Sequence, residues 1–280
     1  MIEESFRLDD DFNKIISDTL KDEGIDKVDK IETISTGWTN MVFEAYTDKG
    51  NYFFRFPRDK FWARTIVKDY EFAKYIHGKT KYETSNLNLG FDNRRPFTYH
   101  KKIKGVPLAD RIDKLSPEKI KQVTNQIAEF MFELHNIEFK PNEVFSVINI
   151  GTNLNDFINE LLDLHVKPED KVFWKSENFD MRENDYCLVH GDLNSSNILL
   201  DDNNNVTAVI DFGFAGYGNK YFDIARIIGR CPKNFEKSIA HEYELLENKK
   251  INEEELNKNI DIWNNIDQGY INYMKSIKLM

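Results

Sequence analysis

The first apolar pattern in the chain has the period of a helix. Over residues 9–22 the large apolar side chains recur at intervals of three and four, at Phe12, Ile15, Ile16 and Leu20. Such spacing places them on one face of an α-helix. We therefore predict a short amphipathic helix at this point in the chain.

Three strands are predicted next, because short runs rich in β-branched and aromatic residues are separated by turn formers. These runs cover residues 31–34, 41–46 and 52–56. A polar loop containing Gly37 separates the first two, and Asp48–Gly50 reads as a hairpin turn between the last two. Strand, glycine-containing loop, strand, turn and strand is the order in which the nucleotide-covering sheet of a kinase begins.

Helical patterns dominate the rest of the chain. One helix is predicted over residues 63–77, before a strand that begins at Pro96. Ser116 is suited to cap a helix that continues to about His135, since Pro117 and an acid follow it. Further helical patterns cover 153–165 and 233–279.

The strongest chemical signal begins at His190, where the chain reads His-Gly-Asp-Leu-Asn-Ser-Ser-Asn-Ile-Leu-Leu. Asp192 and Asn197 are five residues apart, and Asp211, in Val-Ile-Asp-Phe-Gly, follows fourteen later. This is the layout of a kinase catalytic loop followed by its metal-binding Asp-Phe-Gly. The segment predicts phosphoryl transfer from a nucleotide to an alcohol.

Each of these residue types suits its part in that chemistry. Asp192 would accept the proton of the acceptor hydroxyl, and Asn197 and Asp211 would bind Mg²⁺ through oxygen atoms. Two short strands, at 197–200 and 206–210, flank a run of turn formers. A hairpin at this point would bring Asp211 back to the neighbourhood of Asn197.

The run Leu188–Asn197, together with Val209–Gly213, resembles the aminoglycoside phosphotransferase family. That family includes antibiotic kinases and small-metabolite kinases such as choline kinases. Tyr221–Arg226 is similar to the family's "D-L-A" helix start, with Asp223 in the usual place. The resemblance extends from about residue 31 to about residue 228, and it implies ATP or GTP as phosphoryl donor.

The resemblance also implies a fold. We expect an α+β, protein-kinase-like, two-lobed chain. Residues 1–103 would form an N-terminal nucleotide-binding lobe, an antiparallel sheet with one packed helix. Residues 104–280 would form a mainly helical lobe that carries the catalytic hairpin and binds the acceptor.

The third strand should carry the cation that contacts the nucleotide phosphates. Arg55 stands there, where many relatives have Lys and where macrolide and choline kinases also use Arg. The following helix should supply an acid that orients Arg55, and two candidates exist. Asp69 shares an apolar stripe, whereas Glu71 lies on a more polar face, so we favour Asp69.

The segment Lys102–Leu108 resembles the hinge of 2''-aminoglycoside kinases. By that resemblance, the backbone from Lys101 to Ile103 would bind the edge of the purine. His190 would support the catalytic loop rather than act as the base.

Composition and net charge limit the kinds of molecule that the protein is expected to bind. A net charge of −10 disfavours nucleic acid and is compatible with a cationic small substrate. Eighteen consecutive apolar residues do not occur, so we expect no membrane span. Two cysteines do not suggest a disulfide framework, and we expect a cytoplasmic monomer.

The acceptor is expected to be an aminoglycoside. Both the hinge and Ile271–Lys278 resemble 2''-aminoglycoside kinases, and the C-terminal helices are rich in acids that could pair with ammonium groups. These acids are Glu242, Glu244, Glu247, Glu253, Glu254, Glu255, Asp261 and Asp267. The alternatives are a macrolide, choline or a related alcohol as acceptor, or a catalytically dead, nucleotide-binding relative. Most of the acids in the C-terminal helices, however, are expected to lie on solvated helix faces.

Overall fold

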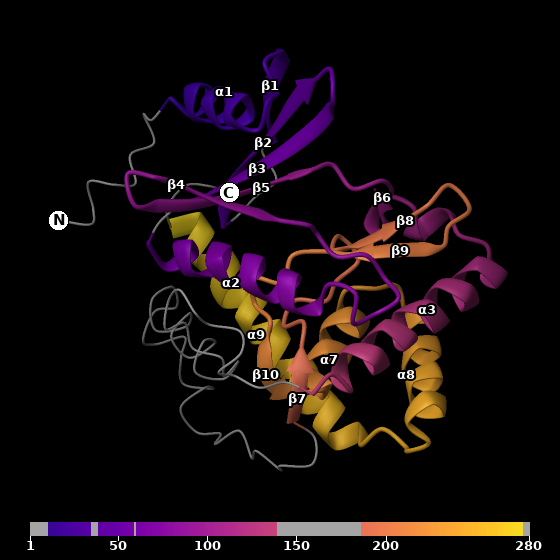
Figure 1. Cartoon of the computed structure of the whole chain (residues 1–280). Helices are drawn as coiled ribbons and strands as arrows, with labels where there is room; N and C mark the ends of the chain where they lie inside the picture. The colour runs from indigo at the N-terminus through magenta and orange to yellow at the C-terminus, as the bar shows by residue number, and fades with distance from the viewer. Residues whose placement is uncertain (1–10, 35–38, 59, 139–185, 277–280) are drawn as a thin grey trace. The chain divides into compact units, whose positions relative to one another are not determined.

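The computed structural model describes residues 11–34, 39–58, 60–138 and 186–276 (Figure 1). The chain divides into two compact units. Unit 1 comprises Met1–His77, Thr84–Lys104 and Asp211–Gly213, and unit 2 comprises Gly78–Glu83, Gly105–Ile210 and Phe214–Met280. The division of function at residue 103 remains a prediction.

Unit 1 contains a five-stranded sheet in which every pair is antiparallel. Its spatial order is β1 (Val28–Ile34), β2 (Asn40–Thr47), β3 (Gly50–Pro57), β5 (Arg95–Lys101) and β4 (Asn88–Asp92). The predicted N-terminal antiparallel sheet is therefore confirmed.

Two helices pack on this sheet, rather than the one expected. The apolar face of α1 (Phe12–Asp22) joins the aromatic side chains of the sheet in one core. Successive strand residues point to opposite faces, so Phe54 enters this core while Arg55 points to the other face, toward α2 (Lys60–Ile76).

Strand β4 has no counterpart in the sequence prediction. It joins β5 through a two-residue turn in which Asn93 and Arg94 both have positive φ, of 45° and 74°. A turn of this kind favours Asn-Gly or Asp-Gly. An arginine in its second position gives no turn signal, and the hairpin is therefore hard to find from sequence.

Unit 2 combines helices with two small sheets. One sheet has the order β6 (Val106–Pro107), β8 (Ile198–Leu200) and β9 (Val206–Val209). The other pairs β7 (Tyr186–Val189) with β10 (Gly216–Asn219).

The helices of unit 2 begin with α3 (Pro117–His135), whose first turn is capped by Ser116 as predicted. Two 3₁₀ turns, η2 (Leu108–Asp110) and η3 (Ile112–Lys114), precede it. The later helices are α7 (Tyr221–Gly229), α8 (Lys233–Glu247) and α9 (Glu253–Ser276), with α3 against α8 and α7 against α9. The helix predicted over 153–165 lies outside the described residues. None of the described helices combines the length and apolar character needed to cross a bilayer.

Phe54 is the test of the unit 1 core, because it is fully buried and stacks on the ring of Tyr99 at 5.2 Å. Phe54→Ala should lower the free energy of unfolding by about 3–5 kcal/mol, the usual cost of removing a buried phenyl ring. Phe91, which is 55% exposed, provides the control. Phe91→Ala should change stability by no more than about 0.5 kcal/mol. Equal losses in denaturant titrations of the two variants would contradict this account of the core.

Candidate active site

The loop that follows β7 is fixed to a buried carboxylate. Asp223, in the first turn of α7, has no exposed surface and accepts the backbone N–H groups of His190 and Gly191 at 2.7 and 2.8 Å. Gly191 has a φ of +80°, and a Cβ there would lie 2.2 Å from the carbonyl oxygen of Phe214. Only glycine fits this position, which explains why the chain has Gly where protein kinases usually have Arg.

His190 is wholly buried and supports the loop. Its Nε2 donates to the carbonyl of Ile210 at 3.0 Å, so Nδ1 is the acceptor that faces the N–H of Asp192 at 3.3 Å. Both ring nitrogens are thus engaged with backbone groups. This geometry matches the supporting part that the sequence suggested for His190.

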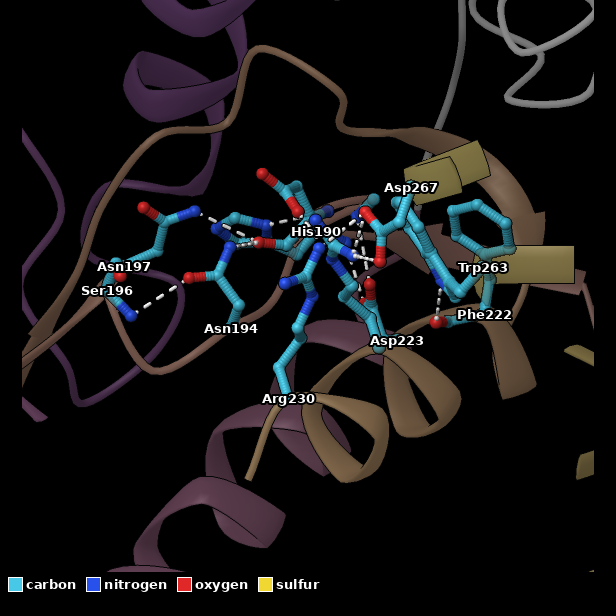
Figure 2. Close-up of polar contacts among 12 residues, drawn as sticks. His190, Asn194, Ser196, Asn197, Phe222, Asp223, Arg230, Trp263 and Asp267 are labelled. Carbon is cyan, nitrogen blue, oxygen red and sulfur yellow. Dashed lines mark hydrogen bonds and ion pairs between the residues drawn. The ribbon is translucent and has the colours of Figure 1, made fainter. Parts of the chain in front are cut away.

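Asp192 is held through its backbone as well as its side chain. Its carbonyl accepts hydrogen bonds from the side-chain amides of Asn194 and Asn197, both at 3.0 Å (Figure 2). The carboxylate is 25% exposed, and its Oδ1 accepts from Nε of Arg226 at 2.7 Å. An amide nitrogen only donates hydrogen bonds, so Oδ1 of Asn197 is the atom suited to a metal.

Arg226 lies inside the quoted Tyr221–Arg226 motif, but no sequence pattern indicated its contact with Asp192. Its NH1 contacts both carboxylate oxygens of Asp267 at 3.0 Å, and its guanidinium lies 3.9 Å from the centre of the Trp263 ring. Burial alone would lower the pKa of Arg226, but the carboxylates of Asp192 and Asp267 more than offset this and raise it.

Unit 1 contains the second group of predicted site residues. Arg55 donates to Asp69 at 2.6 Å and to Asp211 at 2.7 Å. Of the two acids that the sequence left open, Asp69 rather than Glu71 is therefore the acid seen in contact with Arg55. The other oxygen of Asp69 accepts the N–H of Phe212 at 2.8 Å.

The electrostatics of this cluster reflect burial and pairing together. Burial raises the pKa of Asp69, the Arg55 charge opposes that rise, and the nearby Asp211 carboxylate adds to it. Arg55 keeps its proton because Asp211 and Asp69 outweigh the cost of burying a cation. Asp211 has a φ of +69°, an uncommon conformation for a non-glycine residue.

Asn197 and Asp211, the two predicted metal ligands, belong to different units and are described separately. Strands β8 and β9 pair as the predicted hairpin, and the N–H of Ile210 donates to the carbonyl of Asn197 at 2.9 Å. Asp211 is the next residue along the chain. Within the described residues no three His, Cys, Asp or Glu side chains gather as a metal site. The side-chain oxygens of an asparagine and an aspartate are each a ligand type that suits Mg²⁺.

In the predicted hinge, some backbone N–H and C=O groups are already hydrogen-bonded to β3 and others are directed away from it. The N–H of Lys102 donates to the carbonyl of Asn51 at 2.8 Å, so it faces β3. Neighbouring residues in a strand present their backbone groups to the opposite edge. The backbone groups of Lys101, the last residue of β5, therefore point away from β3, although the Lys101 carbonyl already contacts Nδ1 of His100 at 2.9 Å.

Several of the acids proposed for a cationic substrate have partners in the protein. Glu244 pairs with Lys250, Glu247 pairs with Lys220, and Asp267 pairs with Arg226 and Arg230. Glu242 accepts from the side chain of Asn125 at 3.3 Å. These four carboxylates are less available to an ammonium group than their number in the sequence suggested.

The fold and these residues together define a phosphotransferase of the kinase type. A model of the phosphotransferase enzyme family matches residues 30–248, and the chain belongs to that family.

Solved structures with the same fold include three whose ligands or names are informative. The GDP and kanamycin complex of APH(2")-IIia is 20% identical, with a TM-score of 0.68, over 92% of this chain and 89% of that one. The gentamicin complex of APH(2")-IIa is 21% identical, with a TM-score of 0.64, over 97% and 92%. The macrolide 2'-phosphotransferase MphH from Brachybacterium faecium is 15% identical, with a TM-score of 0.54, over 83% of each chain.

His100, next to the predicted hinge, should make the stability of the fold depend on pH. Burial lowers its pKa from 6.5 to about 4. Below pH 6.5 the unfolded chain therefore binds a proton that the folded chain does not, and stability falls as pH falls. Between pH 7.5 and 5, wild type should therefore lose more stability than His100→Gln. Denaturant titrations at both pH values measure this difference, and parallel losses would contradict it.

Proposed function

We propose that the protein transfers the γ-phosphoryl group of ATP or GTP to a hydroxyl group of a small molecule, with Asp192 as the general base. The arrangement of Asp192 carries this proposal. Its backbone is fixed by two asparagines, and its carboxylate is partly exposed and directed by an arginine. A base held in this way meets the geometric need of proton transfer from a bound alcohol.

The donor side is proposed from unit 1. Arg55, oriented by Asp69, would contact the nucleotide phosphates, since an arginine binds phosphate oxygens in pairs and keeps its charge. Backbone groups of Lys101 and Ile103 would bind the purine edge. In this proposal residues 1–103 serve the nucleotide and residues 104–280 serve catalysis and the acceptor.

Asn197 and Asp211 would hold Mg²⁺ through their side-chain oxygens. Arg55 occupies Oδ2 of Asp211, so Oδ1 is the oxygen proposed for the metal. When bound, the ion would neutralise charge on the phosphates. The protein is proposed to act as a monomer in the cytoplasm, where nucleotide triphosphates are available.

An aminoglycoside is the proposed acceptor. The hinge sequence supports this choice, as do the kanamycin and gentamicin complexes among the structures with this fold. One observation favours a second candidate, an alcohol with fewer ammonium groups such as a macrolide. It is that Glu244, Glu247 and Asp267 are already paired with cations of the protein.

A coupled nucleotide-consumption screen decides between these acceptors. Wild type should consume ATP or GTP with Mg²⁺ in the presence of kanamycin or gentamicin. Asp192→Asn should reduce that turnover by about 10²–10⁴-fold, the usual contribution of a general base, while nucleotide binding persists. Turnover with a macrolide or choline alone would move the proposal to that acceptor. Failure with every alcohol, or full activity of Asp192→Asn, would defeat it.

Asp69 and Glu71 offer a matched pair on one helix. Asp69→Asn keeps an oxygen for the N–H of Phe212 but removes the charge that orients Arg55. A hydrogen bond to a charged group contributes about 1.5–3 kcal/mol, so nucleotide affinity should fall roughly 10- to 100-fold. Glu71→Gln should leave it within about twofold. Titration calorimetry with Mg²⁺ and nucleotide measures both, and equal affinities would count against the assignment of Asp69.

A further inference from the structure

Arg226 is the direct side-chain partner of the proposed base. The two side chains meet through Nε and Oδ1 at 2.7 Å. The Arg226 side chain is 11% exposed, so this ion pair is largely shielded from water, unlike an ordinary surface pair. Hydrogen bonds from Asn194 and Asn197 fix the backbone of Asp192 but leave its side-chain torsions free. The contact with Arg226 restrains those torsions.

The contact uses one oxygen of the carboxylate. Among the residues that the structure describes, Oδ2 of Asp192 has no hydrogen-bond partner. A carboxylate held at Oδ1 therefore presents Oδ2 in a defined direction, as a base must for a bound hydroxyl group.

Arg226 is itself held on two further sides. Asp267 contacts its NH1, and the ring of Trp263 lies 3.9 Å from the guanidinium carbon. Trp263 is anchored in turn, since its Nε1 donates to the carbonyl of Phe222 at 3.0 Å (Figure 2). A planar guanidinium suits this arrangement because it can donate from separate nitrogens while a ring covers its face. Lysine has neither property.

We propose that Arg226, held by Trp263 and Asp267, is a positioning residue that directs the carboxylate of Asp192 toward the acceptor hydroxyl. The inference rests on the proposed function, because it assigns Arg226 a part in the reaction of Asp192. It also assigns α9, which carries both Trp263 and Asp267, a part in catalysis as the support of Arg226.

The test combines truncation with chemical rescue. Arg226→Ala should lower kcat for acceptor phosphorylation by about 10- to 100-fold, since a small misplacement of a reacting group has effects of that order. The KM of the acceptor and the affinity for nucleotide should stay within about twofold. Guanidinium ion at low millimolar concentration should restore part of kcat by occupying the space between Asp192, Asp267 and Trp263. A residue that only stabilises the fold would show no such rescue.

Arg230 supplies the matched control, because it contacts Asp267 at 2.6 Å but is not a partner of Asp192. Arg230→Ala should keep kcat within about twofold of wild type, and guanidinium should not raise it. Arg226→Lys should lie between wild type and Arg226→Ala, and it replaces the alanine variant if that variant does not fold.

The outcomes separate the two proposals. A wild-type enzyme that phosphorylates no alcohol overturns the proposed function, and the inference with it. A wild-type enzyme that transfers phosphate, with Arg226→Ala or Arg226→Lys equally fast, overturns only the inference. Loss of kcat without guanidinium rescue, or accompanied by an equal loss in Arg230→Ala, also overturns it.

Discussion

The buried carboxylate of Asp223 is the constraint on which the catalytic loop depends. A charge without exposed surface must be compensated by hydrogen bonds, because water cannot reach it. Three donors do this: the N–H groups of His190 and Gly191, and Nε2 of His135 at 3.2 Å. Loss of any of these hydrogen bonds would leave the buried charge less compensated and would destabilise the fold. The hydrogen bonds therefore hold the loop backbone in place. The other ring nitrogen of His135 contacts the hydroxyl of Tyr243 at 2.7 Å, which links α3, α7 and α8 to the same point.

One helix supports both parts of the loop. Asp223 and Arg226 are three residues apart on α7, and side chains with this spacing lie on the same face. Asp223 holds the backbone of the loop, and Arg226 holds the side chain of Asp192. The orientation of α7 therefore sets the position and the direction of the proposed base together. The neighbouring helix α9, which packs against α7, supplies Asp267 and Trp263 as the partners of Arg226.

Sequence patterns predicted the elements whose signal is local. The apolar face of α1, the turn between β2 and β3, and the cap of α3 are each set by residues within a few positions of one another. The acid nearest Arg55 could also be favoured from sequence, because the stripe shared by Asp69 identifies the buried face of α2. The contact between Arg226 and Asp192 could not, since it joins residues 34 positions apart on different elements. The sequence around each residue contains no periodic pattern that indicates its partner.

The net charge of the chain does not describe the charge near Asp192. A net charge of −10 suggested an acidic cleft for a polycation, yet among the described residues of unit 2 the two carboxylates that contact Arg226 are balanced by cations. Asp192 and Asp267 carry two negative charges, and Arg226 and Arg230 carry two positive ones in contact with them. An ammonium group approaching Asp267 would have to compete with two guanidinium groups already in place. Tight binding of a polycationic acceptor therefore requires carboxylates other than this one. Under the proposed function, binding of a cationic acceptor would depend on acids that lack an internal partner, and the net charge does not identify those acids.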